Sequence, residues 1–337
     1  MSTPGTRVPP PGAGSLRPEQ FLDLIAPKLE RVEAELRRQF TSPVRTVREV
    51  GDHILDGGGK RLRPALLLLV SDMLGYEGDL DVTLAGVIEM IHTASLVHDD
   101  IIDDAEVRRG KTSINYRWGN YLTVLVGDYL YVRALDTALE ARSLEILKTL
   151  SSATIRMTEG EILGFELNGR PDITREDYFD VAERKTAAMF GAACRIPGLL
   201  VQHPAEERLE EYGRNLGICF QLVDDVLDYT SSTAILGKPV LSDLREGKIT
   251  LPLILSRPRA TEAERRLIDR VVTEKDFGST DPQELVAIAN RYDAIEQTRD
   301  IARDYASRAR EALAPFPATA SRKGLEFALD FVLSRER

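Results

Sequence analysis

The strongest constraint on the fold is a helical spacing of apolar residues that runs through most of the chain. Apolar side chains recur at intervals of three and four residues, which places them on one face of an α-helix. The segments with this spacing are about 21–40, 81–104, 121–140, 143–169 and 205–229. No stretch shows a convincing alternation of apolar and polar residues, as a half-buried strand would. The sequence therefore predicts an all-α fold.

Signals for helix starts divide this pattern into ten or more helices. Thr174 and Asp177 have the spacing of a capping box, and a second such pair, Thr261 and Glu264, opens a later helix. Pro197 is expected to end or kink its helix, because proline lacks the N–H that the helix needs.

Length and composition bound the domain organisation. A chain of 337 residues is long enough for two domains, but no shift of composition marks a linker and no internal repeat of solenoid period occurs. The first residues are rich in Pro and Gly and contain no apolar stretch of signal-peptide type. We expect a disordered tail over 1–16 and a single helical domain over 17–337.

Charge and cysteine content argue against several classes of protein. The net charge is −10 and no basic run occurs, which argues against a nucleic-acid partner. The two cysteines, Cys194 and Cys219, form no CxxC pair, so a reducing cytoplasm is the simplest location. The longest uninterrupted apolar runs, such as residues 65–70, are far too short to span a bilayer. We therefore expect a cytoplasmic protein without a transmembrane segment.

The chain contains the pattern D-D-x-x-D twice, each time after a long apolar helical run. The six carboxylates are Asp99, Asp100, Asp103, Asp224, Asp225 and Asp228. Residues four apart share a helix face, so the first and last aspartate of each cluster point the same way. Like charges at this spacing are unfavourable by about 0.2–0.5 kcal/mol per pair, and the C-terminal end of a helix disfavours negative charge. Two such clusters imply a cation that offsets the repulsion.

The ligand types narrow the identity of that cation. Carboxylates with no Cys or His in the pattern suit Mg²⁺, Mn²⁺ or Ca²⁺ better than Zn²⁺. Mg²⁺ usually binds one or two carboxylates together with substrate phosphates, so two facing clusters with a diphosphate between them fit it. A solvated acidic patch is the plain alternative. A di-iron bundle would need two Glu-x-x-His motifs, and only Glu89 and His92 supply one.

Basic residues follow each cluster and a glycine-rich turn. Arginine and lysine bind phosphate oxygens, and glycines let backbone N–H groups approach an anion. The candidates are Lys60, Arg61, Arg63, Arg108, Arg109, Lys185, Lys238 and Lys248. Together with two metal-type clusters they suggest a site for two phosphorylated ligands, one bridged by metal and the other held directly by Lys and Arg.

With these motifs the chain resembles the trans-isoprenyl (polyprenyl) diphosphate synthases of long-chain type. The resemblance spans about residues 50–255 and rests on GGGKRLRP, IEMIHTASLVHDDIIDDAEVRRGK, GNYLTVLVGDYLYVRAL, ERKTAAMFGAAC, FQLVDDVLDYT and LGKPVLSDLREGKITLPLI. It implies a helical bundle around a deep apolar cavity, usually a homodimer. It also implies a Mg²⁺-dependent reaction that joins an allylic diphosphate to isopentenyl diphosphate, head to tail.

The resemblance also implies roles for individual residues. Three Mg²⁺ ions, replaceable by Mn²⁺, would be held by Asp99, Asp100, Asp103, Asp224, Asp225 and Asp228. The allylic diphosphate would contact Arg108, Lys185, Thr186, Gln221, Lys238 and Lys248. Isopentenyl diphosphate would bind Lys60, Arg63, His92 and Arg109. The catalytic set would be Asp99, Asp103, Arg108, Lys185, Asp224 and Lys238.

This chain departs from the usual family pattern in two places. It has Leu241 and Ser242 where Gly-Thr is usual, and Thr112 where Pro is common. The first departure is expected to alter the loop beside Lys238, and neither touches a proposed metal ligand.

Small residues before the first cluster bear on product length. In the family, aromatic residues four and five positions before the first aspartate block the growing chain, and here these positions are Ala94 and Ser95. A helical turn rises about 5.4 Å, close to one isoprene unit, so we expect a long product of about six to ten units. The floor of the pocket would lie deeper, at Met90, Ile91 or Val87, or on the helix over 121–132.

Several alternatives remain open at this stage. A short-chain synthase, or a catalytic subunit that needs a partner, would carry the same motifs. A class I terpene cyclase would normally lack the second D-D-x-x-D and the isopentenyl site. A non-catalytic subunit would tend to lose aspartates that are intact here.

Overall fold

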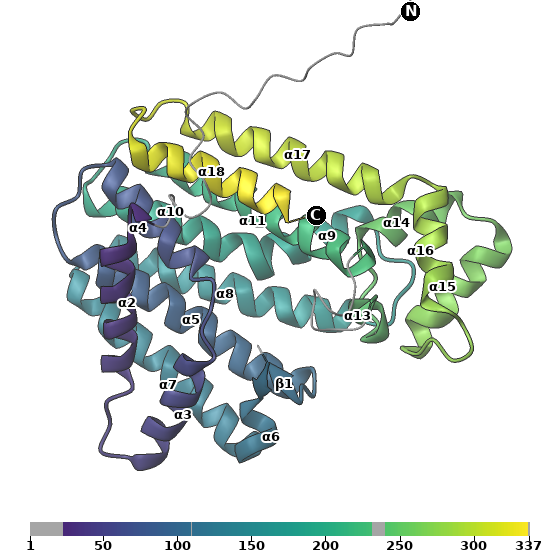
Figure 1. The fold of residues 1–337 in the computed structure, drawn as a ribbon, viewed down its shortest axis with the longest axis horizontal. Coiled ribbons are helices and arrows are strands. Elements are labelled where there is room, and N and C mark those ends of the chain that lie inside the picture. The colour runs from purple at the N-terminus through teal and green to yellow at the C-terminus, as the bar shows by residue number, and fades with distance from the viewer. Residues whose placement is uncertain (1–22, 109, 231–239, 336–337) are drawn as a thin grey trace, which may run out of the picture.

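The computed structural model describes residues 23–108, 110–230 and 240–335, and this part of the chain is a bundle of more than ten helices (Figure 1). The predicted all-α fold is confirmed. The predicted tail over 1–16 lies outside the described residues.

The helices of the first two thirds of the chain are α2 (Ala26–Gln39), α3 (Arg45–Asp56), α4 (Leu62–Met73), α5 (Leu80–Ile102), α6 (Ile114–Trp118), α7 (Asn120–Ala138), α8 (Leu144–Leu167), α9 (Arg175–Ala182), α10 (Ala188–Leu200) and α11 (Glu206–Thr230). The later helices are α13 (Ser242–Arg245), α14 (Leu251–Ser256), α15 (Glu262–Glu274), α16 (Pro282–Arg291), α17 (Ala294–Leu313) and α18 (Ala320–Ser334).

The long helices α5 and α11 organise the bundle. Helix α5 packs against α7 and α4, while α11 packs between α10 and α17. Figure 1 shows α17 and α18 side by side along one side of the molecule, with α10 and α11 next to them. The buried apolar side chains of the described residues form one cluster that extends from Ile25 to Val332. The two aspartate clusters therefore lie at the ends of helices that a common core holds in place.

One helix matches a membrane span by length and composition. Within the described residues only α5 does so, with a mean hydropathy of 1.4 over its most apolar window, of which 67% is buried inside the bundle. The uninterrupted apolar runs considered in the sequence were shorter, because polar residues interrupt this window. Its burial identifies α5 as a core helix.

An irregular turn separates α9 from α10. Residues Glu183–Ala187 form a turn of π-helix, a conformation that often marks functional sites. Two glycines make room for it: a Cβ at Gly160 would lie 2.6 Å from the Lys185 nitrogen, and one at Gly217 would lie 2.6 Å from the Cα of Ala187. The irregularity thus falls at Lys185 rather than at Pro197. Pro197 lies in the last turn of α10, which ends three residues later.

The two predicted capping boxes are present. The Asp177 N–H donates to Thr174 Oγ1 at 3.1 Å, and the Glu264 N–H donates to Thr261 Oγ1 at 3.3 Å. A small hairpin was not predicted: β1 (Val107–Arg108) pairs antiparallel with β2 (Lys111–Thr112). Its strands are two residues long, too short for an alternating pattern to reveal.

Candidate active site

The first aspartate cluster lies at the C-terminal end of α5. Asp99 and Asp100 are in the last turn, and Asp103 is the C-cap residue. The Asp103 N–H donates to the Asp99 carbonyl at 2.8 Å, so the helical i, i+4 relation continues through the cap. Asp99 is half-buried, Asp100 is 2% exposed and Asp103 is open to solvent.

Asp99 lies among other carboxylates. Burial raises its pKa to about 7, and the negative charges of Glu161 and Asp103 add to the rise, although Lys185 and Arg108 oppose it. Glu161 comes from α8 and forms an ion pair with Lys185. No motif in the sequence pointed to Glu161. An ionised Asp99 therefore needs more positive charge than Lys185 and Arg108 provide, as a binding site for a divalent cation would.

Asp100 has a different environment from Asp99. Its carboxylate is buried and ion-paired with Arg108 of the hairpin. Burial raises the pKa of Asp100, and the Arg108 guanidinium counteracts part of that rise. Nearby, His53 Nε2 lies 2.8 Å from the Thr112 carbonyl oxygen, at one of the two positions where this chain departs from the family pattern. Asp100 thus fixes Arg108 beside Asp99. Arg109 lies outside the described residues.

In the second cluster, Asp224 meets the C-terminal end of the chain. Its Oδ1 lies 2.9 Å from Nη1 of Arg335, which directly follows α18. Burial raises the pKa of Asp224, although Arg335, Lys60 and Arg63 act in the opposite direction. Burial also lowers the pKa of Lys60, as does Arg335. Asp224 thus lies close to the cations predicted to bind isopentenyl diphosphate, and Arg335 joins a group that no motif had pointed to.

Asp225 is enclosed within the bundle. It is 1% exposed and accepts hydrogen bonds from the Tyr178 hydroxyl at 2.5 Å and from Gln221 Nε2 at 2.8 Å. Gln221 Oε1 in turn accepts from Thr186 Oγ1 at 2.8 Å. Burial raises the pKa of Asp225 well above its ordinary value. This network ties the second cluster to the π turn that carries Lys185.

Asp228 holds the start of α13. Its Oδ1 accepts from the Ser242 N–H and hydroxyl, both at 3.0 Å, and its Oδ2 accepts from the Asp243 N–H at 3.3 Å. Leu241, just before, has a φ of +58° and is fully buried. That conformation favours glycine, which gives a physical reason for the usual Gly at this position. Here the buried leucine side chain offsets the strain.

Lys248 links the two clusters. Its ammonium lies 3.1 Å from Asp103 Oδ1 and 2.7 Å from Glu246 Oε2. Burial lowers the pKa of Lys248, but the two ion pairs outweigh burial and the pKa is raised. The Lys248 N–H also donates to the Asp243 carbonyl at 2.9 Å. The segment held by Asp228 therefore reaches across to the first cluster. Lys238 lies outside the described residues.

Aromatic rings support the cations near Asp224. The Arg63 guanidinium lies 4.5 Å from the centre of the Phe190 ring, and that of Arg335 lies 4.9 Å from Phe220. The two rings pack together at 5.6 Å between centroids. His92 lies on α5 and is half-buried. The rings hold two cations near one carboxylate, an arrangement suited to a diphosphate.

Arg61 has a structural position instead. It pairs with Glu33 at 2.5 Å and with the buried Glu89 at 2.6 Å. Glu89 is therefore occupied by an arginine, which removes the only Glu-x-x-His motif that favoured a di-iron site. Among the described residues, no group of three or more His, Cys, Asp or Glu side chains could hold a metal ion.

The residues proposed to set product length precede Asp99 on α5. Ala94 is fully buried, Met90 and Ile91 are each 1% exposed, and Ser95 is half-buried. Tyr131 of α7 lies near Asp99 and Glu161, and burial together with their charges raises its pKa to about 12. No motif in the sequence pointed to Tyr131.

Comparison with known proteins identifies the family. The polyprenyl synthetase family matches residues 44–289. The octaprenyl diphosphate synthase of Escherichia coli K12 is 39% identical over 95% of this chain and 99% of its own length. A short-chain isoprenyl diphosphate synthase of Methanothermobacter thermautotrophicus is 33% identical over 94% of this chain and 99% of its own.

Solved structures agree with this match. A decaprenyl diphosphate synthase from Rhodobacter capsulatus has a TM-score of 0.90 and 36% identity, covering 95% of this chain and 99% of that one. A polyprenyl synthase from Caulobacter crescentus CB15, complexed with calcium and isoprenyl diphosphate, has a TM-score of 0.90 and 34% identity, covering 97% and 100%. The family uses divalent metal ions. The chain thus belongs to the polyprenyl synthetase family and is a trans-prenyltransferase of isoprenoid biosynthesis.

Proposed function

We propose that this enzyme condenses an allylic diphosphate with successive isopentenyl diphosphates, head to tail, to give an all-trans polyprenyl diphosphate. The product has about six to ten isoprene units, at roughly one unit per helical turn of α5. Such a product suits the side chain of a respiratory quinone. The observation that supports this function best is the linkage of the two aspartate clusters through Lys248 on one side and through Lys185 and Thr186 on the other.

We assign the metal-facing role to Asp99, Asp103 and Asp224. Asp100, Asp225 and Asp228 belong to the same clusters, but their oxygens already bind Arg108, Tyr178 and the start of α13. Three Mg²⁺ ions, replaceable by Mn²⁺, would supply Lewis-acid stabilisation of the departing diphosphate. The supporting carboxylates then hold the protein groups that surround that diphosphate.

The chain's own cations stabilise the same transition state. Arg108 and Lys185 lie beside Asp99, where negative charge grows on the leaving diphosphate as its carbon–oxygen bond breaks. The remaining contacts to the allylic diphosphate come from Thr186, Gln221, Lys238 and Lys248. The isopentenyl double bond attacks the allylic cation, and the released diphosphate takes the proton, so no side-chain base is needed. Closure of the site must exclude water, which would otherwise capture the cation.

Isopentenyl diphosphate binds on the Asp224 side. Lys60, Arg63, His92 and Arg109 hold its diphosphate. The Phe190 ring, itself packed against Phe220, holds the guanidinium of Arg63, which places its donors before the ligand arrives. One diphosphate is thus bridged by metal between the two clusters and the other is held directly by Lys and Arg, which sets their carbon ends against each other.

Product length depends on the path beside α5. The growing chain passes Ala94 and Ser95 and reaches Met90, Ile91 and then Val87. Neither of the first two positions carries a bulky group that would stop a short product. This favours the long-chain reading over a short-chain synthase.

The active form is a homodimer. Large exposed apolar side chains of the described residues concentrate on α7 and α8, and such a patch marks an interaction surface. They include Tyr121, Leu125, Val132, Leu144, Ile155, Ile162 and Phe165. A second copy of the chain covers this face. Val132→Asp combined with Ile155→Asp is expected to convert a dimer into a monomer in sedimentation equilibrium, and a wild-type monomer would contradict the proposal.

The cytoplasm is the proposed location. Cys194 and Cys219 are both buried, and neither forms a disulfide among the described residues. Thiols of this kind are typical of a reducing compartment.

A single assay tests the function. The purified chain is incubated with Mg²⁺, farnesyl diphosphate and labelled isopentenyl diphosphate, and the product lengths are measured. A ladder of labelled products that ends at a long chain is expected. Hydrocarbon formed without isopentenyl diphosphate would indicate a terpene cyclase instead. Turnover only after a second protein is added would indicate a catalytic subunit that needs a partner.

A further inference from the structure

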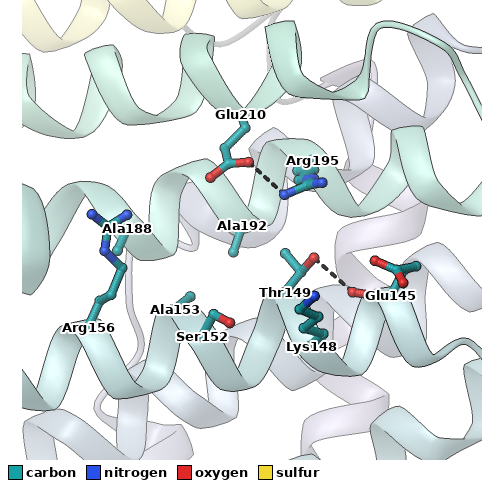
Figure 2. Close-up of a pocket in the computed structure, with 10 residues that line it drawn as sticks. All are labelled: Glu145, Lys148, Thr149, Ser152, Ala153, Arg156, Ala188, Ala192, Arg195 and Glu210. Atoms are coloured by element: carbon teal, nitrogen blue, oxygen red, sulfur yellow. Dashed lines mark hydrogen bonds and ion pairs between the residues drawn. The ribbon is translucent and has the colours of Figure 1, made fainter.

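A cavity outside the active site lies between α8 and α10. Its volume is about 160 Å³, and Glu210 of α11 lies on its rim. Figure 2 shows Arg156 at one end and Lys148 and Arg195 toward the other, with small side chains between them. A cavity of about 150 Å³ accommodates benzene, so this one has room for a compact ligand.

The cavity results from small residues where the two helices meet. Ala153 of α8 and Ala188 and Ala192 of α10 are 5%, 6% and 3% exposed and form its floor together with Ser152. Longer charged side chains surround this floor. Because alanine cannot fill the space between them, the charged groups face a gap.

The charges around this gap are incompletely paired. Arg195 pairs with Glu210 at 2.9 Å and with Glu206 at 3.5 Å, and its buried Nε has no hydrogen-bond partner among the described residues. Lys148 has no ion pair within the described part of the chain. Arg156 reaches only Glu183, at 3.9 Å, and Glu183 has a closer ion pair with Arg214. The lining thus offers two weakly neutralised cations, Lys148 and Arg156, beside two carboxylates, Glu145 and Glu210.

We propose that this cavity is a second anion site that binds a phosphate-type oxyanion between Arg156, Lys148 and Arg195. A multiply charged tetrahedral oxyanion supplies several acceptors at once. It meets the cations at both ends of the cavity. A carboxylate has one charge and would leave one end unpaired.

The site is connected to the catalytic one through Glu183. This residue opens the π turn that carries Lys185 and Thr186. An anion that draws Arg156 toward the cavity removes the weak pair with Glu183 and so shifts the start of that turn. This regulatory consequence rests on the proposed function, since Lys185 then contacts the allylic diphosphate. The binding itself does not depend on that function.

The binding test uses inorganic phosphate as the probe. Isothermal titration of the full-length chain without Mg²⁺ is expected to show that the double variant Lys148→Gln/Arg156→Gln binds one phosphate fewer per chain than the wild type. Lys323→Gln, an exposed lysine of α18, is the control and keeps the wild-type number. Circular dichroism checks that each variant is folded. Equal numbers in the wild type and the double variant would overturn the proposal.

Location and regulation have separate readouts. Crystals soaked in tungstate, a tetrahedral oxyanion, are expected to show an anomalous peak between Arg156 and Lys148. Tungstate only among Lys60, Arg63 and Arg108 would contradict the site. In steady-state kinetics, added phosphate is expected to change the KM for the allylic primer about fivefold more in the wild type than in the double variant. The double variant lacks the second site, so its change in KM measures competition at the active site alone. An equal change of KM in both proteins would refute the regulatory role but would not affect a positive binding result. The binding test can also be carried out if the enzyme proves inactive.

Discussion

Lys248 and Asp103 form an ion pair of 3.1 Å although 145 residues separate them. The pair joins the segment that follows the second aspartate cluster to the end of the helix that carries the first. Asp228 anchors the other end of that segment through Ser242 and Asp243. The two clusters are thus connected by a short run of backbone. A displacement of this segment at one cluster is therefore expected to displace it at the other.

Replacing Lys248 by glutamine tests this bridge. Loss of the ammonium removes the pair with Asp103 and a proposed contact to the allylic diphosphate. We expect kcat/KM for the primer to fall by about 10- to 100-fold, since hydrogen bonds to charged groups are worth about 1.5–3 kcal/mol. Steady-state kinetics with varied primer measures it. Lys323→Gln is the matched control, and an equal loss in both variants would refute a specific role.

Asp99→Asn is expected to stabilise the metal-free protein while abolishing activity. The pKa of Asp99 is raised to about 7, so the folded state binds its proton more tightly than the unfolded state does. Stability of the wild type therefore declines as pH rises from about 4 to about 7, and the variant lacks this decline. Because Asp99 is only half-buried, solvent screening reduces the effect of this shift, and above that range we expect a gain on the order of 2 kcal/mol.

Calorimetry in the presence of a chelator, at pH 5 and pH 8, measures this difference. Asp104→Asn is the control, because Asp104 is an exposed neighbour outside the D-D-x-x-D pattern. A wild type that is as stable as Asp99→Asn at pH 8 would show that neither burial nor the neighbouring carboxylates disfavour the charged form of Asp99.

The second cluster separates into a metal-facing and a structural aspartate. Asp224→Asn is expected to raise the Mg²⁺ concentration needed for half-maximal activity with little effect on melting. Asp228→Asn is expected to lower the stability by roughly 1–3 kcal/mol, because the charged acceptor holds Ser242 and Asp243. Thermal melting and Mg²⁺ titrations of both variants distinguish the metal-facing aspartate from the structural one. The reverse pattern would exchange the two roles.

Tyr178→Phe removes one donor from the buried carboxylate of Asp225. An unsatisfied buried acceptor is unfavourable by roughly 1–3 kcal/mol, so we expect a lower free energy of unfolding. Activity should fall as well, since Gln221 and Thr186 belong to the same network. Urea unfolding measures the first effect. Tyr292→Phe, at a tyrosine far from the site in sequence, should leave kcat unchanged, and a similar loss there would point to a nonspecific effect.

Ala94→Phe is expected to shorten the product while turnover continues. The aromatic ring would occupy the path of the growing chain one helical turn below Asp99. Product lengths are read from labelled polyprenyl alcohols after removal of the diphosphate. Ala138→Phe places the same ring at another fully buried alanine, on α7, and should not shorten the product. An unchanged length in Ala94→Phe would show that the chain does not pass this residue.

Much of the fold was readable from the sequence because its signals are local. Helical spacing gave the all-α class, and Thr174 with Asp177 gave a helix start that the structure confirms. The D-D-x-x-D spacing gave the shared face of Asp99 and Asp103, since it depends only on the geometry of one helix. The hairpin over 107–112 and the π turn at Lys185 were not predicted. Both are short, and the residues that stabilise them lie elsewhere in the chain.

By itself, the sequence determined which residue types carry the chemistry, since the preference of carboxylates for hard cations and of Lys and Arg for phosphate oxygens belongs to the side chains themselves. Only the tertiary structure decided how those residues divide the work. Asp225 and Asp228 were indistinguishable from Asp224 in the pattern, yet their oxygens are bound within the protein. Glu161 and Arg335 reach the site from other helices with no motif to mark them. Burial and pairing depend on neighbours distant in sequence, and local spacing does not encode those neighbours.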